Sequence, residues 1–193
     1  MTSNTDQISC IILAGGRGKR AGGLDKGLIP YKDIPLIEHV INAVKNQVDD
    51  FVISANRNTE TYKRYSANII GDTTQDYQGP LAGIAACIKY CKHKLILIVA
   101  CDMPNLPADL TTRLTSEMKN KSISIATVDG HHQLAMIVAI NGSDADVYDS
   151  VQQKLNTKQL KLIQWVESLP YTTVSFDDNP DAFLNLNHLT IDN

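Results

Sequence analysis

The sequence predicts a three-layer, Rossmann-like α/β domain with a mostly parallel sheet and one antiparallel strand. Two patterns predict this fold. Short apolar runs of strand length alternate with segments whose apolar residues recur at helical spacing, which is typical of a parallel sheet covered by helices. The run KLILIVAC at 94–101 is continuously apolar, as expected of a central strand buried on both faces. At 193 residues, the whole chain (1–193) has the length of one domain.

The N-terminal half begins with a buried strand, QISCIILA at 7–14, and continues with a helix at 35–47. The apolar residues of that second segment fall on one helical face, and Pro35 suits the start of a helix. The patterns that follow predict strands at 50–56, 68–72 and 94–101 and helices at 59–66 and 80–93.

The C-terminal half continues the alternation with one reversal. Asp129-Gly130 predicts a turn between strands at 122–128 and 134–140, so we expect these two strands to be antiparallel. We interpret His131 and His132, which follow, as part of a surface turn rather than a metal site. Helices are predicted at 107–120, 144–155 and 157–168, and a final strand at 171–176.

Composition excludes several classes of protein. The net charge of -3 gives no general attraction to nucleic acid or membrane. No apolar run reaches the ~18 residues of a membrane span, and the polar N-terminus does not resemble a signal peptide. All four cysteines lie in apolar segments, so we expect buried free thiols in a reducing cytoplasm.

Residues 13–27, LAGGRGKRAGGLDKG, form a glycine-rich, cationic loop directly after the first strand. Ligands of open α/β sheets bind at the carboxyl ends of the strands, so chemistry is expected here. Glycines let backbone N–H groups approach phosphate oxygens closely, and Arg17, Lys19, Arg20 and Lys26 add positive charge. A nucleoside triphosphate needs both features, because charge must be neutralised as pyrophosphate leaves.

Two other phosphate-binding loops fit this stretch less well. Residues 16–21 match the dinucleotide pattern G-x-G-x-x-G/A, but two further glycines follow, so a helix cannot start cleanly behind the pattern. The next strand also ends in Ser54 and Asn56, not in the carboxylate that binds the ribose of a nicotinamide cofactor. A P-loop is excluded because neither lysine of the loop is followed by Ser or Thr.

Two aspartates end later strands. Asp102 directly follows the central strand, where one carboxylate is well placed to hold Mg²⁺ beside substrate phosphates. Asp72 ends the strand at 68–72 and is suited to accept a hydrogen bond from a ribose hydroxyl or from an N–H of a base. The segment 79–83, GPLAG, then starts a helix whose backbone is expected to face the base.

The glycine loop resembles the signature of the nucleotidyltransferases that make sugar nucleotides, and its closing GG-x-DKG is similar to that of the molybdenum cofactor guanylyltransferases, the MobA family. The similarity continues in the same order through PLIEHV, SANRNTETY, DYQGPLAGI, VACDMP and FLNLN. The loop and VACDMP are shared with many relatives, whereas DKG with YQGPLAG and the terminal NLN is much more specific.

The resemblance implies a nucleotide-diphospho-sugar transferase type of fold and a reaction that uses Mg²⁺. GTP and the molybdopterin cofactor would give the guanine dinucleotide form of the cofactor and pyrophosphate. The N-terminal part would bind GTP and the C-terminal part molybdopterin. We expect a monomer without nucleic acid or membrane, whose partners include proteins that deliver the cofactor or mature molybdoenzymes.

The resemblance also implies the residues of the site. Lys26 and Arg20 would clamp phosphates and Asp102 would bind the metal, and these three are expected to be catalytic. Asn185 and Asn187 would lie on the molybdopterin side. The expected GTP-binding residues are Leu13, Ala14, Gly15, Gly16, Gly18, Lys26, Asp72, Gly79, Pro80, Leu81, Gly83 and Asp102.

Other functions stay open at this point. One is transfer of CMP to the same cofactor, or of a nucleotide to a sugar phosphate. Another is a non-catalytic module that binds and delivers nucleotide or cofactor. The presence of both Lys26 and Asp102 favours an enzyme.

Overall fold

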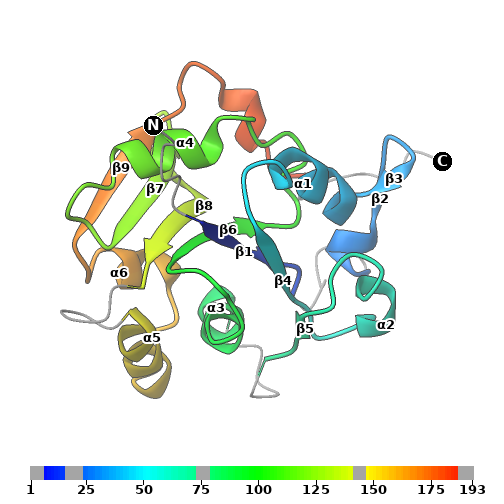
Figure 1. Cartoon of the computed structure of the whole chain (residues 1–193), viewed down its shortest axis with the longest axis horizontal. Helices are drawn as coiled ribbons and strands as arrows, with labels where there is room; N and C mark the ends of the chain where they lie inside the picture. The colour runs from blue at the N-terminus through cyan, green and yellow to red at the C-terminus, as the bar shows by residue number, and fades with distance from the viewer. Residues whose placement is uncertain (1–6, 16–23, 73–78, 141–146, 187–193) are drawn as a thin grey trace.

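The computed structural model describes residues 7–15, 24–72, 79–140 and 147–186. Within these residues, seven strands form one sheet in the order β5-β4-β1-β6-β8-β7-β9 (Figure 1). The strands are β1 (Ile8–Leu13), β4 (Asp50–Ser54), β5 (Ile69–Ile70), β6 (Leu95–Ala100), β7 (Ile123–Val128), β8 (His131–Ala139) and β9 (Tyr171–Ser175). β8 is antiparallel to β6 and β7, and the other neighbouring pairs are parallel. The predicted sheet with one antiparallel strand is confirmed.

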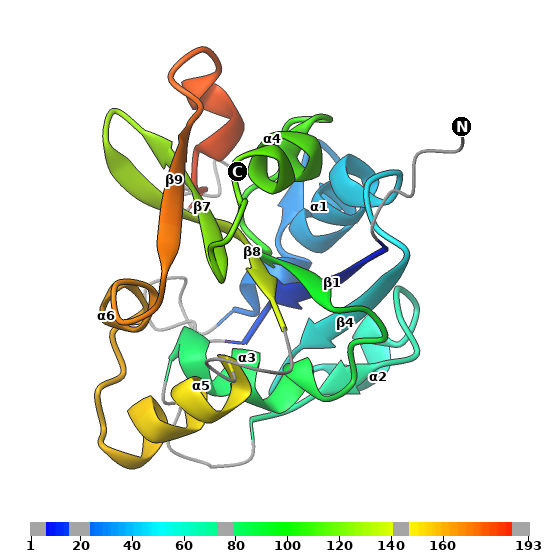
Figure 2. The same cartoon turned by 60° about the vertical axis from the view of Figure 1, so that its left-hand side comes forward.

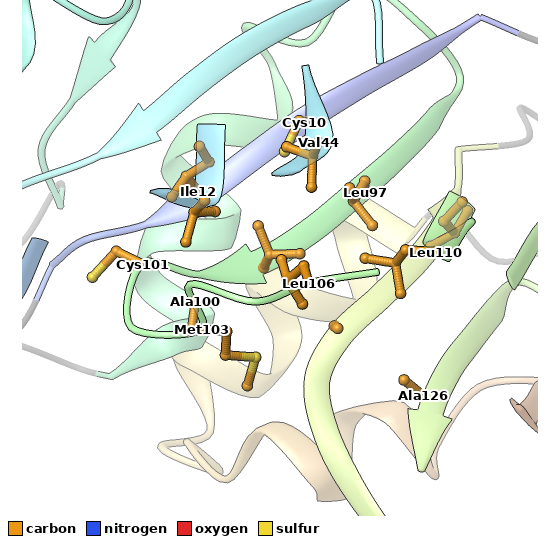
Figure 3. Close-up of a cluster of buried hydrophobic side chains, with 14 of the residues drawn as sticks. Cys10, Ile12, Val44, Leu97, Ala100, Cys101, Met103, Leu106, Leu110 and Ala126 are labelled. Atoms are coloured by element: carbon orange, nitrogen blue, oxygen red, sulfur yellow. The ribbon is translucent and has the colours of Figure 1, made fainter. Parts of the chain in front are cut away.

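Helices pack on both faces of the sheet (Figure 2). They are α1 (Leu36–Val44), α2 (Thr59–Tyr62), α3 (Pro80–Ile88), α4 (Leu110–Ser116), α5 (Val147–Asn156) and α6 (Leu162–Val166). Successive residues of β1 serve opposite faces, because side chains alternate along a strand. Cys10 and Ile12 pack with α1 and α4 (Figure 3), whereas Ile11 and Leu13 pack with α3, α5 and α6. The predicted three layers are therefore present.

A small antiparallel hairpin, β2 (Pro30–Tyr31) with β3 (Ile34–Pro35), was missed by the sequence-based prediction. Its turn is made by Lys32 and Asp33, whose φ values are 48° and 69°. No glycine marks this left-handed turn, so the sequence pattern gave no signal for it. Since Pro35 closes the hairpin, α1 begins one residue later than predicted.

The turn at Asp129-Gly130 is as predicted, but the strand after it is longer. Both residues have positive φ, 49° and 73°, which suits a two-residue hairpin loop. β8 therefore begins at His131 rather than at residue 134. His131 and His132 are exposed and belong to the strand rather than to the turn.

Two properties concern the chain as a whole. Among the described residues, no helix is long and apolar enough to cross a membrane. The four cysteines are free; Cys10, Cys87 and Cys101 are buried and Cys91 is partly exposed.

Candidate active site

Three parallel strands end side by side at one edge of the sheet. β1 lies between β4 and β6, and the register pairs Leu13 with Ser54 on one side and with Ala100 on the other. The pairing continues past the strand ends, because the Ala14 amide donates to the Ser54 carbonyl at 2.9 Å and the Cys101 amide donates to the Leu13 carbonyl at 3.1 Å. The segments that leave these strands therefore start from fixed positions.

Lys26 and Asp102 meet at this edge. The Lys26 Nζ lies 3.1 Å from Oδ2 of Asp102, and the exposed fractions of the two side chains are 30% and 7%. Asp102 directly follows the strand β6, whereas Lys26 belongs to a short 3-10 helix, η2 (Lys26–Leu28). A cation and a nearly buried carboxylate are thus held together where strands of an open α/β sheet present their ligands.

Asp72 is joined to the same edge through Asn56. The Asn56 Nδ2 donates to Oδ2 of Asp72 at 2.7 Å, and the Asp72 amide donates to Oδ1 of Asn56 at 2.6 Å. Burial raises the pKa of the Asp72 carboxyl, and the bond from Asn56 opposes that rise. A Cβ on Gly15 would lie 3.4 Å from the Asn56 Nδ2, so Asp72, Asn56 and Gly15 form one polar corner.

The start of α3 packs directly on the strand ends. Gly79 precedes the helix with φ of 78°, and Pro80 occupies its first position, as is favourable for proline. A Cβ on Gly83 would come within 2.5 Å of the Ser54 Oγ and 3.2 Å of the Leu13 Cδ2. Glycine at this position lets the helix approach β1 and β4 closely.

Several expected GTP-binding residues have side chains that point into the core. Leu81 is fully buried, and Leu13 and Ala14 are each 8% exposed. The Ala14 amide is already used in the sheet. We therefore expect these residues to contribute to nucleotide binding through their other backbone groups and through the shape that they give to the site.

The C-terminal segment reaches the site through its backbone. The Leu186 amide donates to the carbonyl of Asp102 at 3.1 Å. Phe183, at the end of a 3-10 helix η3 (Pro180–Phe183), anchors this segment by packing its ring 4.9 Å from that of Phe176. Asn185, next to Leu186, is exposed. The structure thus brings Asn185 to the side of Asp102, on a segment fixed at both ends.

Four of the expected site residues lie outside the described residues: Gly16, Gly18, Arg20 and Asn187.

The carboxylate at this edge suits a Mg²⁺ ion that is bound partly by the protein and partly by substrate phosphates. Within the described residues, no group of three or more His, Cys, Asp or Glu side chains is arranged to hold a metal ion. Mg²⁺ is usually bound by one or two carboxylates together with substrate phosphates and water. Asp102, a carboxylate at a strand end, supplies that kind of ligand.

Sequence reasoning missed the residues that support this site. Asn56 holds Asp72, and Asp25, immediately before Lys26, accepts hydrogen bonds from the buried Tyr62 Oη at 2.5 Å and from the Asn58 Nδ2 at 3.1 Å. All of them lie inside the quoted motifs SANRNTETY and DKG. The motifs marked the segments, but only the fold shows which residues meet.

The sequence matches the family model of the MobA-like NTP transferase domain over residues 10–168. It is 40% identical over 185 residues to a protein of Polynucleobacter asymbioticus named molybdenum cofactor guanylyltransferase, covering 94% of this chain and 92% of the relative. A protein of Shewanella sediminis with the same name is 35% identical over 182 residues, covering 94% and 91%.

Solved structures share the fold. One is molybdopterin-guanine dinucleotide biosynthesis protein A from Archaeoglobus fulgidus, with a TM-score of 0.73 and 22% identity over 94% of this chain and 93% of that one. Another is 4-diphosphocytidyl-2C-methyl-D-erythritol synthase from Anaerococcus prevotii, with a TM-score of 0.70 and 14% identity over 95% and 92%. At these identities the likeness concerns the fold alone.

Proposed function

The chain belongs to the family of MobA-like NTP transferase domains, and from this premise we propose that it is a molybdenum cofactor guanylyltransferase. An oxygen of the terminal phosphate of the molybdenum–molybdopterin cofactor attacks the α-phosphorus of GTP. The bond from that phosphorus to the pyrophosphate oxygen breaks. The products are molybdopterin guanine dinucleotide and pyrophosphate.

The observation that carries the proposal is the ion pair of Lys26 with Asp102 at the carboxyl edge of β1 and β6. The attacking phosphate is already anionic, so no general base is needed, and catalysis reduces to positioning and charge neutralisation. A cation and a carboxylate on rigid elements supply what such a site requires. The names of the relatives support the choice of substrates.

Lys26 is assigned to the phosphates of GTP. Its ammonium group is a compact charge with three donors, and it is 30% exposed, within reach of a bound ligand. Its Nζ is paired with Oδ2 of Asp102 at 3.1 Å. When the triphosphate binds, Lys26 turns from Asp102 to phosphate oxygens and offsets the negative charge that develops on the leaving pyrophosphate.

Asp102 is assigned to Mg²⁺. The bound ion supplies charge stabilisation for the phosphate oxygens. Asp102 holds its carboxylate in place because its neighbour Cys101 is bonded to β1 and its own carbonyl accepts from Leu186. Its side chain is only 7% exposed, so little water competes for it.

Asp72 and Asn56 are assigned to recognition of guanosine. Guanine offers N1–H and N2–H donors, and adenine lacks both. Asp72 has acceptor capacity beyond its bond with Asn56. An adenine in this place would leave a half-buried acceptor unpaired, at a cost of about 1–3 kcal/mol.

The C-terminal part is assigned to molybdopterin, with Asn185 and Asn187 on its side. The support is the bond of Leu186 to the Asp102 carbonyl, which brings the segment 183–186 beside the proposed metal ligand. We propose one domain with these two substrate regions, acting as a monomer in the cytoplasm. Free thiols on all four cysteines suit that compartment.

The test is incubation with Mg²⁺, molybdenum–molybdopterin cofactor and each of GTP, ATP, CTP and UTP in turn, followed by detection of pyrophosphate and of the dinucleotide product. Only GTP is expected to give both products. Turnover with CTP would indicate a cytidylyltransferase, a reading that the fold shared with the Anaerococcus enzyme leaves open. Nucleotide binding without turnover would indicate a delivery module.

A further inference from the structure

A buried contact beneath the site is not used by the proposed chemistry. Tyr62 is fully buried at the end of α2. Its hydroxyl donates to Oδ1 of Asp25 at 2.5 Å, and the Asn58 Nδ2 donates to Oδ2 of the same carboxylate at 3.1 Å. Asp25 is 9% exposed and directly precedes Lys26. The short segment 58–62 therefore binds the Asp25 carboxylate through two hydrogen bonds.

Tyr62 also touches the residue on the other side of Lys26. A Cβ built on Gly27 would collide with the Tyr62 hydroxyl and would lie 3.3 Å from two ring carbons. Gly27 is itself buried. The same phenol thus contacts residues 25 and 27, and the backbone of Lys26 is held between two fixed points.

The backbone of the segment 58–62 is fixed by its own hydrogen bonds. Asn58 has φ of 50°, a left-handed conformation that asparagine tolerates better than most residues. Its carbonyl accepts from the amides of Thr61 at 2.9 Å and Tyr62 at 3.2 Å. One helical turn therefore carries both groups that bind Asp25, and residues four apart on a helix lie on the same side.

We propose that Tyr62, together with Asn58, is a positioning residue for the transfer reaction. These residues fix Asp25 and Gly27, and thereby hold the Cα of Lys26 where its flexible side chain brings Nζ to Asp102. This inference rests on the proposed function. A lysine has four rotatable bonds, so a fixed Cα strongly limits where its charge can lie. A displacement of about 1 Å at a reacting centre can cost on the order of 100-fold in rate.

The first test compares Tyr62→Phe with Tyr65→Phe. Each variant loses one phenol hydroxyl that contacts a carboxylate, but the Tyr65 hydroxyl bonds Glu38 at 3.4 Å and not a residue next to Lys26 in the chain. We expect Tyr62→Phe to lower kcat by roughly tenfold, with KM for GTP changed by less than about twofold. Tyr65→Phe is expected to keep the kcat of the unaltered chain.

A merely structural role gives a different result. It would lower the melting temperature of Tyr62→Phe but leave kcat unchanged when measured well below that temperature. A Tyr62→Phe variant with unaltered kcat therefore overturns the inference. Asp25→Asn keeps an oxygen for the Tyr62 hydroxyl and is expected to retain more activity than Asp25→Ala; equal loss in both would assign the effect to the charge of Asp25 instead.

The second test uses the collision at Gly27. Gly27→Ala alone should push Tyr62 away and lower kcat more than Tyr62→Phe does. Removal of the hydroxyl removes the closest of these contacts and leaves the two ring carbons at 3.3 Å, so the double variant Gly27→Ala with Tyr62→Phe is expected to recover most of the way to the level of Tyr62→Phe alone. Strictly multiplicative losses would contradict direct contact as the cause.

The inference and the proposed function can fail separately. An unaltered chain that does not turn over GTP and molybdopterin counts against the function. In that case the crystal structure of Tyr62→Phe still decides the inference: the separation of Lys26 Nζ and Asp102 Oδ2 is expected to widen from 3.1 Å. An unchanged pair would refute the positioning role, whatever the enzyme's substrates are.

Discussion

At the residue scale, the chemistry of the proposed site depends on two opposite charges that lie side by side. Lys26 and Asp102 form an ion pair, with Nζ and Oδ2 3.1 Å apart. The Lys26 ammonium lies against the nearly buried carboxylate of Asp102, and it supplies the counter-charge without which burial of that carboxylate would be costly. Binding of Mg²⁺ and a triphosphate would give Asp102 the metal ion, and Lys26 the phosphate oxygens, as new partners.

Lys26→Ala is expected to keep the fold and to lower turnover. Loss of one charge-assisted hydrogen bond costs about 1.5–3 kcal/mol, which corresponds to roughly 10- to 150-fold in rate. The measurement is kcat at saturating Mg²⁺ and GTP, with circular dichroism as a check of the fold. Lys45→Ala, which removes an exposed lysine whose Nζ donates to Oδ1 of Asn42 at 3.0 Å, is the matched control. A near-normal rate in Lys26→Ala would remove this residue from the mechanism.

Asp72→Asn is expected to stabilise the chain in a pH-dependent way. Burial raises the pKa of Asp72 above its usual 3.8, so the unfolded chain loses this proton at lower pH than the folded chain does. Ionisation of Asp72 therefore lowers the stability of the fold once the pH exceeds the pKa that this carboxyl has in the unfolded chain. Asparagine keeps an oxygen for Asn56 but cannot ionise.

The measurement for Asp72→Asn is the melting temperature of both chains from about pH 3 to pH 7. The two values should agree below the usual pKa of 3.8, and the variant should become the more stable one as the pH rises through and beyond it. Its KM for GTP at pH 7 should increase, because an anionic acceptor binds donors more strongly than a neutral one. A stability difference that does not depend on pH would contradict the assigned cause.

At the scale of elements, two short segments decide where the functional side chains lie. α2 (Thr59–Tyr62) is one helical turn, and it secures the residues on both sides of Lys26. The segment after η3 is extended, and it is tied to Asp102 by a single backbone bond. Both elements are short, and each is bonded to a segment that carries a proposed functional residue, Lys26 or Asp102.

Asn185→Asp is expected to impair use of the molybdopterin cofactor more than binding of GTP. Asn185 is exposed beside Leu186, whose amide bonds the Asp102 carbonyl, and a new carboxylate there would repel the phosphate of the second substrate. The measurement is KM for each substrate. Asn120→Asp adds the same charge at an exposed position near the start of β7, at the opposite edge of the sheet, and should change neither. Equal losses for both substrates would contradict the division into two substrate regions.

Elements with strong local patterns were predictable from the sequence, and short elements without such a pattern were not. The run at 94–101 became β6 (Leu95–Ala100) because burial on both faces requires a continuous apolar stretch. The hairpin of β2 and β3 has two residues in each strand and no glycine in its turn, so it left no pattern. Helices α2 and α6 are shorter than predicted, because helical spacing alone does not locate helix ends.

The site shows the same limit. The glycine loop and the carboxylate after a central strand identified Lys26 and Asp102, and the structure places them 3.1 Å apart. The bond between Tyr62 and Asp25 joins residues 37 positions apart in the sequence. A tyrosine at the end of a polar helical turn looks like a surface residue until the fold shows its partner.

At the scale of the whole molecule, the sheet separates two apolar cores and presents the site along one edge. Six of its seven strands, all from described residues, point the same way. β1, β4 and β6 therefore end together and can hold one ligand between the segments that follow them. Three of the cysteines are buried in these cores or next to the site.

The native chain is expected to react slowly with thiol reagents at neutral pH. Burial raises the pKa of Cys87 and of Cys91 to about 12 and also raises that of Cys10 and Cys101, so little of the reactive thiolate forms. In denaturant without reductant, titration should find all four thiols. Protection of two or four thiols in denaturant would indicate disulfides and contradict a reduced core.

The central claim is that the carboxylate of Asp102 acts in the chemistry at this edge, rather than only supporting the fold. Asp102→Asn tests it most directly, because asparagine keeps the shape and an acceptor for Lys26 but loses the charge that Mg²⁺ requires. The measurement is turnover of GTP and molybdopterin cofactor across a range of Mg²⁺ concentrations, beside the melting temperature. We expect most activity to be lost, together with its response to Mg²⁺, while the melting temperature stays close to that of the unaltered chain. Full activity of Asp102→Asn at ordinary Mg²⁺ concentration would contradict the claim.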